Sequence, residues 1–238
     1  MTGKTFTVPT GIVGPWVIVC EGDADRYFFQ TLLKERAIKG FDTPFPAKTD
    51  QGGTGRFPDM LQSLERHFDK LTGGVLIVAD SKNNEDNIFR LVRKKIKTAN
   101  KKGGLHYPIP TALNRVEPAT ADAPAIAIIT VPGWGGVGGL ETLCLKALAS
   151  KSPKIRKCVE GYMRCSGADQ WGDHETMDKA RLQTFIAGFH KNDPNNALKH
   201  AVRNGLIPLR HRYFNQIVRF LKSLPRTTQA ASIEKAGA

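Results

Sequence analysis

The chain has 238 residues, of which 40% are hydrophobic and 24% are charged, a balance that excludes a disordered chain and fits a globular protein. The formal net charge of +13 favours polyanionic partners such as nucleic acid, although a generally basic surface that serves solubility would give the same value. The four cysteines form no CxxC pair, which argues against a zinc ribbon, and no apolar run approaches the roughly 20 residues that cross a bilayer. Since no signal-peptide pattern is present, we expect a cytoplasmic protein.

The first half of the chain predicts alternating strands and helices. Continuous apolar runs predict buried strands at 16–20 and 75–79. Apolar residues at helical spacing predict helices over 23–37, 58–70 and 85–102. A weak strand at 41–48, interrupted by prolines, suits the edge of a sheet.

The second half predicts one more strand and then helices alone. The strand covers 125–131 and leads through a glycine-rich loop to a short helix at 140–149, whereas the proline-punctuated segment 107–122 is not assigned. Further helices are expected at about 177–190, 195–204 and 213–224. We therefore expect an α/β domain with a parallel sheet flanked by helices over 1–150, a helical extension packed on it over 151–225, and a disordered tail over 226–238.

Each of the three clear strands delivers an acidic residue to its carboxyl end. Glu21 and Asp25 follow the first strand, Asp80 follows the second, and Glu141 lies after the glycine-rich loop that leaves the third. The carboxyl ends of parallel strands share one crevice, which is where open α/β sheets bind ligands. Carboxylates gathered there repel one another unless a cation or a proton lies between them. The pattern therefore predicts a metal-dependent site.

These acidic segments resemble the signatures of the TOPRIM fold, which primases, topoisomerases and overcoming-lysogenization-defect (OLD) type nucleases share. Glu21-Gly22-x-x-Asp25 is similar to the first signature, and Asp80 is similar to the first aspartate of the second, normally Asp-x-Asp. Gly139-Leu140-Glu141 resembles a further glutamate of the nuclease branch. The resemblance covers about residues 16–149. It looks closest to small stand-alone bacterial TOPRIM-like proteins related to the OLD nucleases.

The resemblance implies an activity and roles for individual residues. Glu21 would be a general acid/base or a metal ligand, and Asp25, Asp80 and Glu141 would hold one or two Mg²⁺ (or Mn²⁺) ions. The implied function is a magnesium-dependent phosphodiesterase that nicks or cleaves DNA or RNA. The implied partner is nucleic acid. Because the larger nucleases of this type carry an ATPase motif and this chain has none, the resemblance also allows a separate ATPase partner. The proteins with which the family occurs suggest a role in phage defence. Hard oxygen ligands of this kind suit magnesium.

One position departs from the TOPRIM pattern, because Lys82 stands where the second aspartate of Asp-x-Asp is expected. Two explanations compete. Glu85 or Asp86 could reach back from the next helix and supply the missing carboxylate, although acidic residues at a helix start also complement its dipole. Alternatively, the site is degenerate, and Lys82 contacts a phosphate or neutralises a neighbouring carboxylate. The degenerate site suggests a second function, a non-catalytic nucleic-acid-binding or regulatory module.

Several other segments could serve a ligand or be purely structural. The turn at 51–56 could cradle a phosphate, but it lacks the P-loop pattern and suits a connecting turn. Trp134, in the glycine-rich loop at 132–139, could stack on a base, or the loop could be a flexible link. The segment 173–175 has metal-ligand residue types without ligand spacing, so a solvated helix start is expected.

The remaining residues of interest are cysteines and basic side chains. Cys20 and Cys144 lie in apolar stretches and are expected to be buried. Basic side chains on one face of the helix at 85–102, together with others at 151–157, could follow a phosphate backbone, although a solvated helix face is the commoner explanation.

Overall fold

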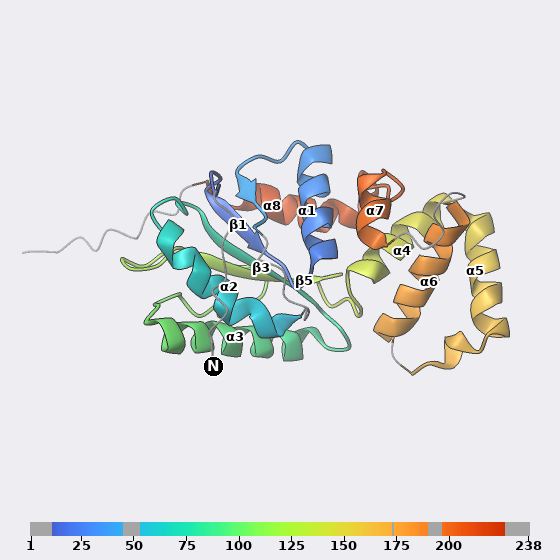
Figure 1. Cartoon of the computed structure of the whole chain (residues 1–238), viewed down its shortest axis with the longest axis horizontal. Helices are drawn as coiled ribbons and strands as arrows, with labels where there is room; N and C mark the ends of the chain where they lie inside the picture. Colours follow the sequence, from blue (N-terminus) through green and yellow to red (C-terminus); the bar gives the residue numbers. More distant parts are fainter. Residues whose placement is uncertain (1–10, 45–52, 173, 190–196, 227–238) are drawn as a thin grey trace, which may run out of the picture.

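The computed structural model describes residues 11–44, 53–172, 174–189 and 197–226. Its centre is a five-stranded sheet in the order β2-β1-β3-β5-β4 (Figure 1). Four strands are parallel, namely β1 (Trp16–Val19), β2 (Phe41–Asp42), β3 (Gly74–Asp80) and β5 (Ile126–Val131). The short β4 (Val116–Glu117) pairs antiparallel with β5 at one edge. This arrangement confirms the predicted fold class, a mostly parallel sheet flanked by helices.

Helices connect the parallel strands and then continue beyond them. The first four are α1 (Asp23–Glu35), α2 (Phe57–Leu64), α3 (Glu85–Gly103) and α4 (Leu140–Lys151). The C-terminal part consists of α5 (Pro153–Cys165), α6 (His174–Phe189), α7 (Leu198–Arg203) and α8 (Asn215–Ser223). Four short 3₁₀ turns complete the described part: η1 (Thr54–Arg56), η2 (Glu65–His67), η3 (Ala168–Gln170) and η4 (Arg212–Phe214).

Most predicted elements are confirmed, and the differences have local causes. The helix predicted over 58–70 ends at Leu64, where a 3₁₀ turn takes over. The weak strand is indeed at the sheet edge, and 45–48 lie outside the described residues. Helix α5 was not predicted. Its apolar residues Ile155, Val159 and Met163 recur every four residues, a spacing that could have revealed it.

The two faces of the sheet are covered by different helices, because successive residues of a strand point to opposite sides. Val17, Val19 and Ile77 pack with α2 and α3, while Ile18, Leu76 and Val78 pack with α1 and the C-terminal helices. Figure 1 shows α2 and α3 on one side of the sheet and α1 and α8 on the other. These strand residues are buried on both faces, which explains why they read as unbroken apolar runs.

The C-terminal helices share one core with the sheet. Phe214 and Leu221 belong to the same buried cluster as Phe28 of α1 and Ile18 of β1. α6 packs against α4, and α5 lies on the outer side of α6 (Figure 1). Of the extension, α6 therefore stands beside α4 at the carboxyl edge of the sheet, where the predicted site lies, whereas α8 covers a face of the sheet. No helix in the described ranges combines the length and apolar character that a bilayer crossing requires.

Candidate functional site

Two of the predicted acidic residues meet at the carboxyl edge of β1 and β3. Val19 pairs with Ile77, so Glu21 lies level with the end of β3. The backbone N–H of Asp80 donates to Glu21 Oε1 at 3.1 Å. Parallel pairing of adjacent strands thus places Glu21 beside Asp80, although 59 residues separate them in the chain.

The other two acidic residues come from the first turns of α1 and α4, which both begin at this edge. Asp25 accepts the N–H of Gly22 at 2.9 Å, a helix-capping bond. Asp80 Oδ1 accepts the N–H of Leu140 at 3.0 Å, which brings the start of α4, and with it Glu141, to the end of β3. Glu21, Asp25, Asp80 and Glu141 together form what we call the carboxylate centre.

The side chains of the carboxylate centre act on one another electrostatically. Burial raises the pKa of Asp25 to about 7, and the charges of Glu141 and Glu21 add to the effect. Burial likewise raises the pKa of Asp80 well above its ordinary value, reinforced by Asp25, Glu21 and Glu141. Ionising all of these carboxylates at neutral pH costs electrostatic free energy, unless a cation binds between them.

Gly139 leaves room for the Asp80 carboxylate. A Cβ at position 139 would lie 2.8 Å from the carboxyl carbon of Asp80, closer than side-chain carbons approach. Any other residue at the start of α4 would therefore displace Asp80 or the helix. Gly139, which is part of the motif Gly139-Leu140-Glu141, is therefore required at this position because a side chain would collide with Asp80.

Lys82 lies on the surface beside the carboxylate centre. Its side chain is exposed and its φ of 50° is in the left-handed region. Burial raises the pKa of Glu21, while the Asp80 N–H and the charge of Lys82 act in the opposite direction. The position that departs from the TOPRIM pattern thus carries a positive charge close enough to favour ionised Glu21.

Glu85 reaches back from α3, but to the end of β5 and the glycine-rich loop. One carboxylate oxygen accepts the Thr130 hydroxyl and the other accepts the Gly135 N–H at 2.6 Å. Asp86 is exposed. Because both oxygens of Glu85 are engaged in the loop, Glu85 does not take the place of the missing second aspartate in this structure.

Sequence reasoning missed two residues of α6, Lys179 and Glu175, which form an ion pair at 2.5 Å. Burial lowers the pKa of Lys179, but the bond to Glu175 and the charges of Glu141 and Asp80 outweigh it, so the pKa is raised. Glu175 adds to the rise in the pKa of Glu21. The sequence predicted a solvated helix start here, because no spacing rule links α6 to strands some 100 residues earlier. Asp173 lies outside the described residues.

A hydrogen-bond network holds α6 against the carboxylate centre. Thr142, the neighbour of Glu141, accepts the Gly139 N–H at 3.2 Å and donates its hydroxyl to Asp178 at 2.6 Å. Asp178 also pairs with Arg181 at 3.3 Å. Since Lys179 follows Asp178 directly, this network fixes the base of the Lys179 side chain.

The carboxylates of the carboxylate centre are the ligand type that magnesium prefers, but they do not surround a single point as a complete set of ligands would. Among the described residues, no three acidic, histidine or cysteine side chains converge as a ready metal site. Magnesium, however, keeps several waters and is usually held by one or two protein carboxylates. Asp25 and Asp80 meet that requirement: both are partly buried, and each has one oxygen fixed by a backbone N–H.

The remaining predictions have mixed outcomes. Cys20 and Cys144 are buried as expected, and Cys158 and Cys165 are exposed. The glycine-rich loop is no free link, because Lys82 and Gly138 exchange two backbone hydrogen bonds of 2.7 Å. Trp134 is partly buried against the main core. Of the turn at 51–56, residues 51 and 52 lie outside the described part.

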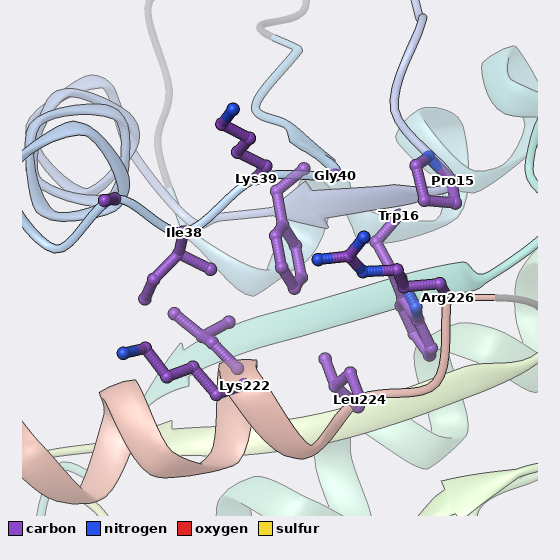
Figure 2. Close-up of a pocket in the computed structure, with 11 residues that line it drawn as sticks. Pro15, Trp16, Ile38, Lys39, Gly40, Lys222, Leu224 and Arg226 are labelled. Atoms are coloured by element: carbon purple, nitrogen blue, oxygen red, sulfur yellow. The ribbon is translucent and has the colours of Figure 1, made fainter.

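A separate pocket of about 310 Å³ lies at the opposite, amino end of β1. Figure 2 shows the guanidinium of Arg226 extending among Trp16, Ile38 and Leu224. The Trp16 indole donates to the carbonyl of Pro225 at 2.6 Å. The pocket thus marks where the end of α8 is anchored to the sheet, and it does not belong to the carboxylate centre.

Comparison with known proteins gives one match. The model of a family described as "Protein of unknown function (DUF3226)" matches residues 15–226. No curated protein and no solved structure matches the chain. The matched range includes the sheet, the carboxylate centre and the C-terminal helices.

Proposed function

For this chain, which belongs to the DUF3226 family, we propose a magnesium-dependent phosphodiesterase activity that nicks or cleaves nucleic acid. The observation that carries the proposal is the carboxylate centre itself. Side chains from β3, from the end of β1 and from two helix N-termini lie at one sheet edge, and burial, reinforced by their mutual charges, raises the pKa of Asp25 and Asp80. The resemblance of Glu21-Gly22-x-x-Asp25 and Asp80 to TOPRIM signatures points the same way.

In the proposed mechanism the acidic residues have distinct tasks. Asp25 and Asp80 would hold Mg²⁺ (or Mn²⁺), with Glu141 contributing directly or through water. The bound ion would lower the pKa of a water molecule and neutralise charge on the phosphodiester. Glu21 would accept or return the proton, since its partly buried carboxylate is held by the Asp80 N–H.

Two lysines would act on the substrate rather than on the metal. Lys82 and Lys179 come from different elements and both influence the carboxylate centre electrostatically. Their exposed amines would attract a phosphate to the centre. This assignment also explains a lysine at position 82, where a second metal-binding aspartate is expected from the TOPRIM pattern.

The test is cleavage of plasmid and oligonucleotide substrates with Mg²⁺ or Mn²⁺. Glu21→Gln and Asp80→Asn should each reduce cleavage by more than about 100-fold, since each removes a group that acts on the reacting atoms. Asp23→Asn is the matched control, because the Asp23 carboxylate pairs with Arg26 and Lys199 instead. Calorimetry on the same samples should show Mg²⁺ binding lost with Asp80→Asn. Full cleavage by both variants would refute the proposal.

A second candidate is a non-catalytic nucleic-acid-binding or regulatory module. It is favoured by Lys82 and by the engagement of Glu85 in the glycine-rich loop, which together leave the second aspartate unreplaced. This candidate predicts salt-sensitive binding that survives Glu21→Gln, with no cleavage by any variant. The two candidates therefore differ in a single assay.

Location and partners complete the proposal. The four free cysteines agree with a reducing compartment, so a cytoplasmic site of action fits. A separate ATPase partner and a role in phage defence follow from the TOPRIM resemblance alone. Co-purification with an ATPase would support that part.

A further inference from the structure

The pocket at the amino end of β1 carries three cationic side chains from three separate segments. Lys39 lies in the connection between α1 and β2, Lys222 in the last turn of α8, and Arg226 beyond α8. All three are exposed, and no acidic residue is among those that line the pocket. In the part of the chain that the structure describes, none of the three makes an ion pair.

The guanidinium of Arg226 extends into this pocket, with Ile38 on one side and Trp16 on the other (Figure 2). Its backbone is positioned by the preceding residue, Pro225, whose carbonyl accepts the Trp16 indole N–H at 2.6 Å. A guanidinium has five N–H donors and no acceptor. Since no acceptor among the described residues bonds to Arg226, these donors are available to an anion.

The acidic side chains of the neighbouring elements are engaged elsewhere. Asp42 of β2 accepts the N–H groups of Val13 and Gly14 at 2.7 and 2.6 Å and does not line the pocket. Glu35, at the end of α1, pairs with Arg210 at 3.5 Å. The pocket therefore has cations without an internal counter-charge.

The nearby helix ends account for only part of this positive charge. The last turn of α8 and the residues just after α1 both line the pocket, and a helix C-terminus carries about half a negative charge. The two ends together offset about one of the three cations. An excess of roughly two positive charges remains for a ligand.

The other walls of the pocket are apolar. Trp16, Leu221 and Leu224 are buried, whereas Ile38 and Phe41 are half-buried and present carbon surface to the pocket. Sites for small molecules combine such walls with a few charged groups. The volume of about 310 Å³ is at the lower end of the usual range of roughly 300–1,000 Å³.

A phosphate monoester matches this combination better than a carboxylate does. It carries a charge of about −1.5 to −2 at neutral pH and three strong acceptor oxygens. A carboxylate has a single charge and would leave part of the positive excess uncompensated. The apolar walls require in addition that the ligand carry an organic group, which inorganic phosphate lacks.

We propose that this pocket binds a small phosphomonoester, up to about the size of a mononucleotide. The phosphate contacts Arg226, Lys222 and Lys39, and the organic group packs against the half-buried apolar side chains. The pocket lies at the opposite edge of the sheet from the carboxylate centre, so this ligand site is distinct from the proposed catalytic site and does not rest on the phosphodiesterase activity.

The experiment is calorimetric titration of the full chain with AMP and with phenyl phosphate, at low salt and with a chelator that keeps Mg²⁺ from the carboxylate centre. Both probes should bind more tightly than inorganic phosphate or adenosine, which each lack one half of the ligand. Lys222→Gln combined with Arg226→Gln should weaken binding at least about tenfold, because each substitution removes a hydrogen bond between charged groups.

The matched control is Lys157→Gln with Arg164→Gln, which removes the same two residue types from the exposed side of α5. It should bind both probes like the wild type. Ile38→Trp supplies an independent test, because it fills the pocket without changing the charge. It should also weaken binding at least about tenfold, with circular dichroism and urea unfolding confirming that the variant is folded.

Several results would overturn the inference. Equal losses in the two double variants would show that binding follows net charge alone, and full binding by folded Ile38→Trp would place the ligand outside the pocket. Binding that is lost in Asp80→Asn but kept in the pocket variants would assign the probes to the carboxylate centre. If neither AMP nor phenyl phosphate binds, or if a phosphorylated oligonucleotide binds more tightly through the same residues, the pocket is not a site for a small phosphomonoester.

Discussion

At the scale of single residues, the carboxylate centre places partly buried carboxylates close together, which is electrostatically unfavourable. Asp25 and Asp80 are partly buried near Glu21 and Glu141, and the pKa of each aspartate is raised by burial and by these neighbours. Backbone N–H groups at the starts of α1 and α4 offset part of the cost. Such an arrangement has a consequence for stability that can be measured without knowing the substrate.

Metal-free protein should lose stability as the pH rises from about 4 to about 7. The folded state raises the pKa of Asp25 from 3.8 to about 7, so it binds a proton that the unfolded chain releases. The free energy of unfolding therefore falls across this window. Asp25→Asn keeps the side-chain shape without the charge. In urea unfolding with a chelator, it should show a shallower pH dependence and greater stability than wild type at pH 7.5.

The control for this prediction is Asp169→Asn, which changes an exposed carboxylate on η3. It should follow the wild-type pH dependence. Adding Mg²⁺ at pH 7.5 should stabilise the wild type more than Asp25→Asn, since bound ligand stabilises only a state that binds it. An Asp25→Asn variant with the wild-type slope would contradict the assigned cause.

At the scale of elements, the glycine-rich loop is held by Lys82 of the β3–α3 connection and by Glu85 at the start of α3. Lys82 pairs with Gly138 through the backbone, and Glu85 accepts from Thr130 and Gly135. The loop leads directly into α4, so its conformation decides where Gly139 and Glu141 lie. Glu85 therefore supports the carboxylate centre indirectly, by ordering the segment before it.

Glu85→Ala should loosen the loop while the sheet stays intact. Removing the carboxylate leaves the Gly135 N–H and the Thr130 hydroxyl without this acceptor, so local opening becomes easier. Hydrogen exchange should become faster in peptides covering 132–139 and remain slow in β3 and β5. Asp86→Ala removes an exposed acid from the same helix turn and should have no such effect. Equal exchange in both variants would rule out the supporting role of Glu85.

At the scale of the whole molecule, the C-terminal helices are attached to the sheet by buried apolar packing and by the hydrogen bonds of the Arg36 guanidinium. Arg36, just after α1, donates to the carbonyls of Leu209 and His211 at 2.9 and 3.1 Å and to the Asn215 side chain at 3.0 Å. These bonds join α1 to the connection between α7 and α8. The sheet and the extension should therefore unfold together.

Arg36→Met should lower the free energy of unfolding by about 2–3 kcal/mol, because it removes several hydrogen bonds to a charged group. Urea unfolding, followed by fluorescence and by circular dichroism, should show one transition for wild type and variant. Arg210→Met is the control, since its side chain is 78% exposed and its pair with Glu35 spans 3.5 Å. That exposed pair should contribute less than about 1 kcal/mol. A similar effect of both substitutions would refute the special role of Arg36.

The sequence by itself determined the three central strands, the sheet class and the residues at the ends of those strands, whereas the short β4 lies in a segment to which the sequence assigned no structure. Continuous apolar runs identify doubly covered parallel strands, and parallel pairing then sends Glu21 and Asp80 to one edge whatever the details of packing. Glycines before Asp25 and Glu141 were visible as motifs. These features are local, or follow from a general rule of sheet topology, and so can be derived without coordinates.

Only the tertiary structure decided the contacts between distant segments. It turned Glu85 toward Thr130 and Gly135, placed Lys179 and Glu175 of α6 beside the carboxylate centre, and brought Arg36 to the α7–α8 connection. Each outcome depends on how helices pack across the sheet, and helix packing leaves no periodic trace that links such positions in the sequence. Packing also set which side of α5 faces solvent.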